Sequence, residues 1–200
     1  MMRLFVIHGT RAMATGKLPL NDLAGGAGRM DVLVRALMSA LLTSHGLRED
    51  TEVILLLDGS PGPCRRIRFV GSELRGFHSE ERAVAGKIAA VIRNPLPPRG
   101  HWKEITPGVY DGNGDLQMTL QEITAPLIRL EADAPRLWGE VAIPSQSKPF
   151  SGDIAFVLGD DKPLECIQGI PRSLGSTWLQ GHSCITLCHF LLDESIELQL

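Results

Sequence analysis

The sequence predicts an α/β fold, with a mostly parallel sheet and helices on both faces. Short apolar runs typical of buried strands alternate with segments whose apolar residues recur at helical spacing. In addition, three of the expected strands end on a glycine, at Gly59, Gly71 and Gly159. Ligands in such folds bind beyond the carboxyl ends of the strands, so we expect the functional site near one of these glycines.

The first expected strand covers residues 3–8, which are rich in large apolar side chains. A glycine-rich segment, residues 21–31, then leads into a helix that begins near Val32, because apolar residues follow at spacings of three and four. We expect this helix to stop at Gly46. Residues 52–58 are apolar without alternation, which is typical of a strand buried on both faces.

Two further elements complete the first half of the chain. Residues 66–70 are expected to form a strand after a Pro-Gly-Pro turn. Ser79 is expected to begin a helix with Glu80 and Glu81 in its first turn, where carboxylates favour the positive helix end. This helix must end before the prolines of residues 95–100, which form a linker.

The second half of the chain has fewer clear signals. The expected elements are strands at residues 126–130 and 153–158, a loop at 133–151 and an apolar helix at 184–192 that could extend to Glu197. Residues 111–125 fit a helix or a strand equally well.

The charge of the chain is distributed unevenly. Lys and Arg number 20 against 23 Asp and Glu, for a formal net charge of −3. Residues 1–100 carry 14 basic and 9 acidic residues, a net +5, whereas residues 101–200 carry 6 and 14, a net −8. Arg65, Arg66 and Arg68 form a local cluster that could hold phosphates or lie on a solvated surface.

Several enzyme classes and cell locations are disfavoured by the sequence. No apolar stretch approaches the roughly 18 to 20 residues of a membrane span, and no signal-peptide core is present, so we expect a cytoplasmic protein. The cysteines are then expected to be free thiols. A Gly-Lys-Ser/Thr phosphate loop and a dinucleotide fingerprint are both missing from the sequence, which argues against an enzyme that uses nucleoside triphosphates.

Several short segments carry a resemblance to a known family, in the same order and with similar spacing over nearly the whole chain: residues 22–33, 69–74, 79–82, 106–110, 156–160 and 184–187. They closely resemble the TrmY family of tRNA pseudouridine N1-methyltransferases. This family belongs to the SPOUT class of RNA methyltransferases, which depend on S-adenosylmethionine. The resemblance implies a single domain over residues 1–200 with a C-terminal trefoil knot, acting as a homodimer without a metal ion.

The resemblance also implies a cofactor site for S-adenosylmethionine. It maps to Leu130, Gly159, Leu174, Gly175, Ser176, Thr177, Trp178, Leu179 and Cys184. Residues 171–181 are rich in Gly and Ser between two apolar elements, and could form the flat slot that adenine needs or be an ordinary surface loop. Residues 175–179 differ from the archaeal enzymes, and relatives with such differences also occur in bacteria. We expect Cys184 to pack against the cofactor rather than react, although it could equally lie in the core.

Methyl transfer from a sulfonium is an in-line displacement, so it mainly requires positioning and a group that takes a proton from the attacking nitrogen. Asp31 is the candidate for contacting the target base, as proton acceptor or positioner, with Arg29 on a neighbouring phosphate. Asp31 could instead cap the helix that follows it. Glu73 could contact substrate or pair with an arginine, and Arg35 and Arg82 could bind RNA or form surface salt bridges.

The target base must lie outside a stack, so the expected substrate is a pseudouridine in a structured RNA loop, the T-loop of a tRNA above all. Two other functions remain open. One is a cysteine hydrolase or metal site built from His182, Cys184, Cys188 and His189. The other is a non-catalytic RNA-binding or cofactor-binding protein that keeps the same fold.

Overall fold

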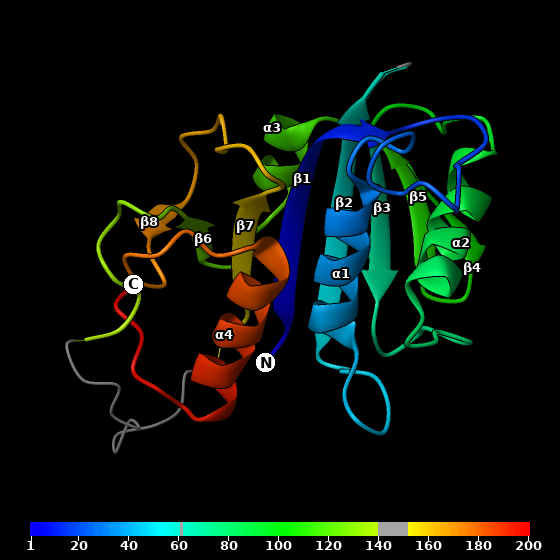
Figure 1. The fold of residues 1–200 in the computed structure, drawn as a ribbon. Coiled ribbons are helices and arrows are strands. Elements are labelled where there is room, and N and C mark those ends of the chain that lie inside the picture. Colours follow the sequence, from blue (N-terminus) through cyan, green and yellow to red (C-terminus); the bar gives the residue numbers. More distant parts are fainter. Residues whose placement is uncertain (61, 140–151) are drawn as a thin grey trace.

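The computed structural model describes residues 1–60, 62–139 and 152–200. An eight-stranded sheet in the order β4-β5-β3-β2-β1-β7-β6-β8 forms its centre (Figure 1). In chain order the elements are β1 (Arg3–Met13), α1 (Met30–Leu41), β2 (Thr51–Gly59), β3 (Arg65–Val70), α2 (Glu81–Ile92), β4 (Trp102–Thr106), β5 (Val109–Asn113), α3 (Leu116–Gln121), β6 (Leu127–Leu130), β7 (Ile154–Gly159), β8 (Ile170–Arg172) and α4 (Gly181–Asp193).

The sheet has a parallel half and an antiparallel half. The pairs β2·β1, β1·β7, β7·β6 and β6·β8 are parallel. The pairs β2·β3, β3·β5 and β5·β4 are antiparallel. The α/β prediction is confirmed, but the sheet is mixed, because β4 and β5 form an antiparallel extension for which the sequence has no strong apolar run.

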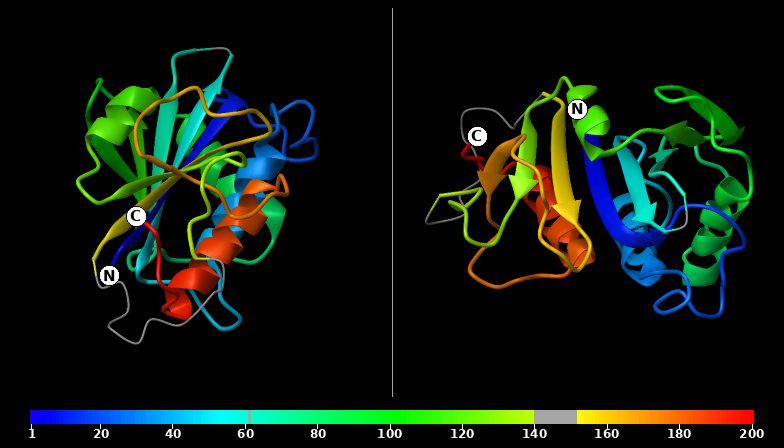
Figure 2. Two further views of the ribbon diagram at one scale, coloured as in Figure 1. Left: turned by 90° about the vertical axis from the view of Figure 1, so that its left-hand side faces the viewer. Right: turned by 90° about the horizontal axis from the view of Figure 1, so that it is seen from above.

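Helices cover the two faces unequally. The long helices α1, α2 and α4 lie on one face of the sheet, and the short α3 lies on the other (Figure 2). Side chains of β1 alternate accordingly: Phe5 and Ile7 join the core under the long helices, whereas Val6 packs with Leu120 of α3. No helix in residues 1–60, 62–139 and 152–200 has the length and apolar composition needed to cross a membrane.

Three expected helix boundaries differ from the structure. The first helix ends at Leu41 rather than Gly46, because Leu42 is extended and forms a bridge with Leu47. The second helix starts at Glu81, with only that glutamate in its first turn, and Glu80 is its N-cap. The last helix ends at Asp193 and does not continue to Glu197.

The second half contains elements that the sequence pattern does not resolve. The ambiguous residues 111–125 contain both the end of β5 and the helix α3, which explains why neither reading fitted alone. Strand β8 has three residues, too few for a period to appear. The expected turn at Pro61 and the segment 140–151 of the expected loop lie outside the described residues.

Strand β1 continues past its expected end at His8 as far as Met13, and two glycines make this possible. A Cβ atom on Gly28, which has φ 68°, would lie 1.8 Å from the carbonyl oxygen of Arg11, and one on Gly59 would lie 2.1 Å from it. Only glycine permits this approach. The extension carries Arg11 beyond the carboxyl edge of the sheet, next to the glycine-rich loop.

Candidate active site

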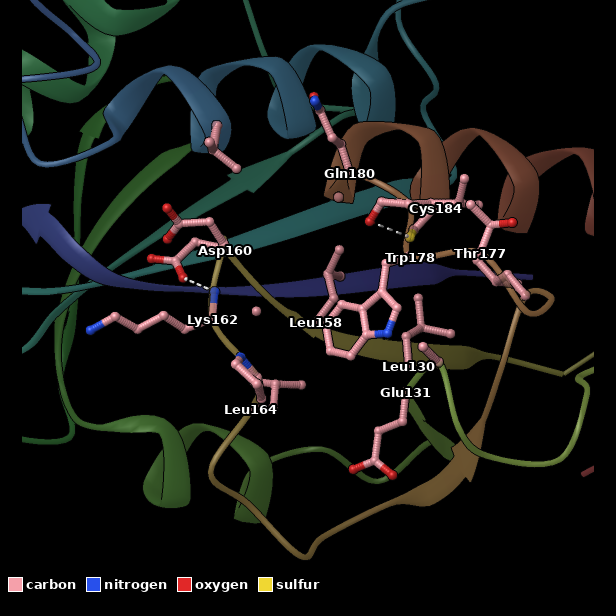
Figure 3. A pocket seen from close by; sticks show the side chains of 18 of the residues that line it. Leu130, Glu131, Leu158, Asp160, Lys162, Leu164, Thr177, Trp178, Gln180 and Cys184 are labelled. Carbon is pink, nitrogen blue, oxygen red and sulfur yellow. Dashed lines mark hydrogen bonds between the residues drawn. The ribbon is translucent and has the colours of Figure 1, made fainter.

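A pocket of about 580 Å³ lies at the carboxyl ends of β6 and β7, where the topology predicts a ligand site (Figure 3). One wall consists of Leu130 from β6 and Leu158 and Gly159 from β7. The loop before α4 forms another wall, and residues 160–164 after β7 form a third. The volume suits a ligand the size of a nucleoside with a side chain.

Most of the expected cofactor residues meet in this pocket. The lining includes Leu130, Gly159, Leu174, Gly175, Thr177, Trp178, Leu179 and Cys184. Ser176 does not line it; this residue faces an adjoining pocket that also includes Gly175 and Trp138. Trp178 is 69% exposed, and Figure 3 shows its indole beside the same cavity as Leu130 and Leu158.

The loop before α4 presents several backbone N–H groups. Within the described residues, the N–H groups of residues 174–179 donate to no other protein group. The loop therefore offers apolar side chains and hydrogen-bond donors to the same cavity. A Cβ atom on Gly159 would lie 2.4 Å from the carbonyl oxygen of Lys162, so the return of the chain after β7 requires glycine there.

Sequence reasoning missed the residues that follow β7. Asp160 accepts hydrogen bonds from the Thr10 N–H at 2.7 Å, the Thr10 hydroxyl at 3.0 Å and the Lys162 N–H at 3.0 Å. These bonds fix the third pocket wall to β1. The signal was present, because Asp160 and Asp161 directly follow one of the three strand ends marked by a glycine.

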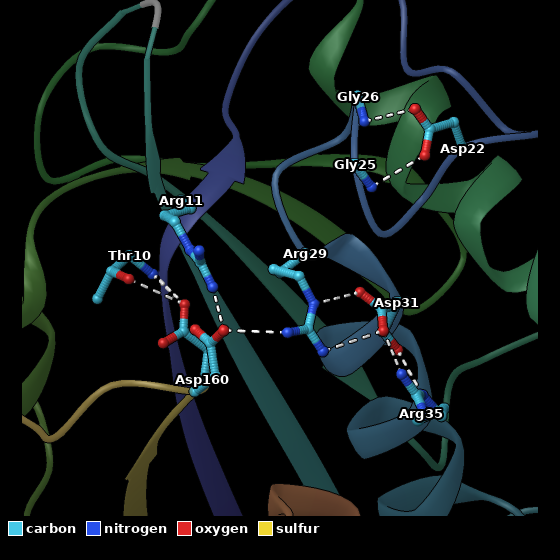
Figure 4. Close-up of polar contacts among 10 residues, drawn as sticks. Thr10, Arg11, Asp22, Gly25, Gly26, Arg29, Asp31, Arg35 and Asp160 are labelled. Atoms are coloured by element: carbon cyan, nitrogen blue, oxygen red, sulfur yellow. Dashed lines mark hydrogen bonds and ion pairs between the residues drawn. The ribbon is translucent and has the colours of Figure 1, made fainter.

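A chain of alternating arginines and aspartates lies at the mouth of the pocket (Figure 4). Arg29 donates from Nε to Asp31 Oδ1 at 3.0 Å and from a terminal nitrogen to Asp161 Oδ2 at 3.0 Å. Arg11 also pairs with Asp161, and Arg35 also pairs with Asp31. Arg29 lines the pocket, whereas Asp31 is not among the residues that line it.

Asp31 is an ionised carboxylate in the first turn of α1, and it is not the N-cap. The N-cap is Arg29, with φ 64°, and no side chain caps the helix, so the capping alternative is wrong. Burial alone would raise the pKa of Asp31, but the hydrogen bond and charge of Arg29 and the charge of Arg35 outweigh it and lower this pKa. Both carboxylate oxygens are engaged by arginines.

Two of the expected RNA-binding residues lie away from the pocket. Glu73 follows β3 close to Thr51, where β2 begins, and so lies at the opposite end of the sheet. Its carboxylate accepts a hydrogen bond from the Tyr110 hydroxyl at 2.6 Å, which raises the pKa of Tyr110 to about 12. Arg82 is exposed in the first turn of α2.

The arginine cluster of β3 is turned into the protein. Arg65 and Arg66 are at most 1% exposed, and they pair with Asp111 and Glu122 respectively. Arg68 pairs with Glu52 at 2.6 Å on a partly exposed position. The phosphate-binding reading therefore fails for Arg65 and Arg66, because neither guanidinium reaches solvent.

Among the described residues, the two thiols and His189 of the cysteine hydrolase alternative are not arranged as a nucleophile and base. Burial raises the pKa of both Cys184 and Cys188, so both thiols are neutral at physiological pH. His189 is buried, with one ring nitrogen 2.9 Å from Arg3 and the other 3.0 Å from the Ala40 carbonyl. The described part of the chain also contains no group of three His, Cys, Asp or Glu side chains that could hold a metal ion.

Comparison with known proteins identifies the family. The model of a family described as "Putative SAM-dependent RNA methyltransferase", where SAM is S-adenosylmethionine, matches residues 2–196. The tRNA (pseudouridine(54)-N(1))-methyltransferase of Methanocella arvoryzae is 44% identical over 96% of this chain and 100% of its own. The enzyme of that name from Methanosarcina mazei is 36% identical over 97% of this chain and 92% of its own.

The fold has a solved counterpart. The structure of Archaeoglobus fulgidus Nep1 bound to S-adenosylhomocysteine matches with a TM-score of 0.61 at 14% identity, and the match covers 96% of this chain and 98% of that one. At this identity the match speaks for the fold alone. Taken with the match of the family model and the relatives above, it leads to one identification: the chain belongs to the SAM-dependent RNA methyltransferase family, alongside the tRNA (pseudouridine(54)-N(1))-methyltransferases.

Proposed function

We propose that this protein transfers the methyl group of S-adenosylmethionine to N1 of a pseudouridine in tRNA, at position 54 as in the names of its relatives. One observation carries the proposal: a cavity of cofactor size opens beside the arginines and aspartates at the carboxyl edge of the sheet. The methyl donor and the target base would meet at the opening of this cavity.

The pocket residues fit the cofactor. Leu130, Leu158, Leu174, Leu179 and Cys184 offer an apolar slot for adenine. The N–H groups of residues 174–179, which have no acceptor within the described part of the chain, offer donors for its ring nitrogens. When bound, the cofactor supplies a methyl group on a positively charged sulfur. The chain's own contribution is to hold both partners in line and to keep water out.

Arg29 and Asp31 act on the acceptor. Pseudouridine carries a hydrogen on N1, because its sugar is attached through carbon, so this nitrogen is available for attack. Once N1 bonds to the methyl group this hydrogen becomes acidic, and it leaves as a proton to solvent at the pocket mouth. Asp31 is a poor general base at neutral pH, since its pKa is lowered and both its oxygens are engaged. We assign it a positioning role: it fixes the guanidinium of Arg29, which lines the pocket and contacts the RNA next to the target base.

The RNA-binding part of the proposal includes three further residues at different places in the fold: Arg35, Arg82 and Glu73. Arg35 continues the row of charges from Asp31 along the outer face of α1, within reach of the same RNA segment. Arg82 and Glu73 lie at the other end of the sheet, so they could contact only a part of the RNA distant from the target base. A folded tRNA is large enough to extend that far.

The assembly is also part of the proposal: one domain over residues 1–200, a C-terminal trefoil knot and a homodimer in the cytoplasm, where tRNA is processed. The segment after β6 supports the knot, because Leu137 bonds to Ser173 on one side and to Gln199 on the other. Phe190, on the outer face of α4, is 53% exposed and supports a dimer contact on that helix. Light scattering of the purified protein tests the dimer, and a monomer would contradict it.

Two measurements test the activity. Titration calorimetry with S-adenosylmethionine should give micromolar binding, which the variant Gly159→Ala should weaken, because its new methyl group meets the Lys162 carbonyl. Methyl transfer should then occur on a tRNA T-arm hairpin that contains pseudouridine, and not on the same hairpin with uridine, whose N1 is bonded to the sugar. Cofactor binding without turnover on either hairpin or on tRNA would favour the non-catalytic alternative.

A further inference from the structure

Two arginines from different parts of the chain converge on one carboxylate oxygen at the pocket mouth. Asp161 Oδ2 accepts from Arg29 at 3.0 Å and also from Arg11. Within the described residues, no other hydrogen bond reaches this carboxylate. The three side chains remain partly exposed, at 34% for Arg29, 45% for Arg11 and 31% for Asp161.

The two arginines are anchored in different ways: the backbone of Arg11 is fixed, and the guanidinium of Arg29 is held by a second carboxylate. Arg11 lies on the extension of β1, whose backbone is confined by Gly28 and Gly59. Arg29 is oriented by Asp31, which engages its Nε at 3.0 Å and one terminal nitrogen at 3.3 Å. Its remaining terminal nitrogen points to Asp161 and to the pocket. If the Asp161 carboxylate moved away, Arg29 would keep its orientation, and the guanidinium of Arg11 would lose its partner among the described residues and become available to another anion.

Asp161 contributes little to holding the loop after β7. Its neighbour Asp160 does that, through hydrogen bonds to Thr10 and to the Lys162 N–H. Ion pairs as exposed as those of Asp161 contribute little to stability. Two neighbouring guanidinium groups that share one exchangeable anion suit a phosphate, because arginine binds phosphate oxygens in the same geometry as carboxylate oxygens.

We propose that Arg11 and Arg29 form a phosphodiester site for the substrate RNA, and that Asp161 occupies it as an internal substitute until RNA binds. This inference rests on the proposed function and deepens it, since it adds Arg11 as an RNA-binding residue and gives Asp161 a role. RNA binding exchanges one anion for another: a phosphate pairs with the two arginines in place of the Asp161 carboxylate, which turns to solvent. The exchange happens beside the cofactor, because Arg29 and Asp161 both line the pocket.

The test measures RNA affinity by fluorescence anisotropy with a labelled, pseudouridine-containing T-arm hairpin, using the full chain with S-adenosylhomocysteine present to prevent turnover. Asp161→Asn should bind the hairpin about three-fold more tightly, because no carboxylate competes with the phosphate. Arg11→Gln should bind it about five-fold more weakly and should lower the slope of log affinity against log salt by about 0.7 to 0.9.

Matched controls separate this site from general charge effects. Asp153→Asn makes the same charge change at the opposite edge of the sheet, where Asp153 accepts from the Met2 N–H. Arg99→Gln removes an exposed arginine that pairs with Asp115 beside β5. Both controls should leave the affinity for RNA within about two-fold of wild type.

Two outcomes would overturn the inference. Unchanged or weaker RNA binding by Asp161→Asn would mean that this carboxylate does not compete with RNA. A parallel loss of cofactor affinity in the same variant, measured by calorimetry, would mean that Asp161 serves the pocket instead. If the wild-type protein neither binds nor methylates the hairpin or tRNA, the proposed function itself is wrong. That result differs from a failure of the Asp161 inference alone, in which the wild-type protein is active.

Discussion

Two arginines, one from each half of the molecule, pair with aspartates in opposite environments. In the antiparallel half, Arg65 of β3 is 1% exposed and donates to Asp111 twice at 2.7 Å and to the carbonyls of Ala14, Ile92 and Asn94. In the parallel half, Arg29 is about one-third exposed at the pocket mouth. The same residue type is structural in one half and available to a ligand in the other.

Burial and completeness of pairing make the difference. A guanidinium whose donors are all used inside the protein has nothing left for a ligand, and removing its partner leaves a buried charge. A guanidinium near solvent can exchange one anion for another at little cost in stability. The antiparallel half thus serves as a scaffold, while the parallel half holds the site at its carboxyl edge, as expected for strands of this orientation.

The largest expected effect lies in the scaffold. Asp111→Ala should lower the free energy of unfolding by about 3 to 5 kcal/mol, because Arg65 would remain buried without its counter-ion. Asp161→Ala, which removes the partner of exposed arginines, should lower it by less than about 1 kcal/mol. Urea denaturation measures both. Equal losses of unfolding free energy in the two variants would contradict the distinction between the buried and the exposed arginines.

The second effect concerns His189, which links α4 to α1 and β1 at the amino edge of the sheet. Burial, with the nearby charges of Arg48 and Arg3, lowers the pKa of His189 to about 4, from 6.5 in the unfolded chain. The unfolded state therefore binds a proton at higher pH than the folded state. Stability should fall by roughly 3 kcal/mol as the pH drops from about 6.5 to about 4.

Urea denaturation over this pH range tests that prediction. The variant His189→Gln should lose this part of the pH dependence, and His45→Gln, at an exposed position, should keep it. The carboxylate of Asp193, whose pKa is lowered by Arg48 and Arg3 against the effect of burial, adds a loss of the same sign only at more acidic pH. An unchanged pH dependence in His189→Gln would contradict the assignment.

The third effect concerns catalysis at the pocket mouth. Asp31→Asn should reduce methyl transfer about a hundred-fold, because Arg29 loses the charge that orients it. Cofactor affinity should remain within about two-fold, since Asp31 does not line the pocket. Because the pKa of Asp31 is already lowered, wild-type kcat/KM should show no inflection from this group between about pH 6 and 8. An inflection that disappears in Asp31→Asn would instead identify Asp31 as the general base.

The smallest effect is expected at Cys184. Its thiol is half-buried against the cofactor pocket and its pKa is raised by burial, so it should contribute contact area and no reactivity. Cys184→Ser should weaken S-adenosylmethionine binding about three-fold and leave kcat nearly unchanged. The matched variant Cys166→Ser, outside the pocket lining, should change neither. A large loss of kcat in Cys184→Ser would give this thiol a chemical role.

The parallel half was predictable from the sequence because its strands are buried runs. Strands β2 and β7 appear as unbroken apolar segments, and their predicted positions agree with the structure to within a residue or two. Strand β4 does not, because three of its five positions carry polar side chains and only Trp102 and Ile105 are apolar, so no period emerges. The sequence therefore predicted a larger parallel share of the sheet than the structure has.

The site was partly predictable for a similar reason. The pocket walls lie in continuous segments whose motifs resemble a known family, whereas the ion pairs join residues far apart in the chain. Arg65 and Asp111 are 46 residues apart, and Arg66 and Glu122 are 56 apart, so no local pattern shows which arginines are buried. Arg11 was missed because its position depends on the extension of β1, which only the packing of distant glycines allows.

The central position of β1 has a consequence for how the molecule assembles. Phe5 pairs with Val53 of β2 on one side and with Phe156 of β7 on the other, some 150 residues further along the chain. During synthesis the first strand can find its β2 neighbour early, but its β7 neighbour appears only when most of the chain has been made. Pairings of such long range form slowly. Strands β1 to β5 can therefore pair before β7 exists, and the pocket at the ends of β6 and β7 is completed last.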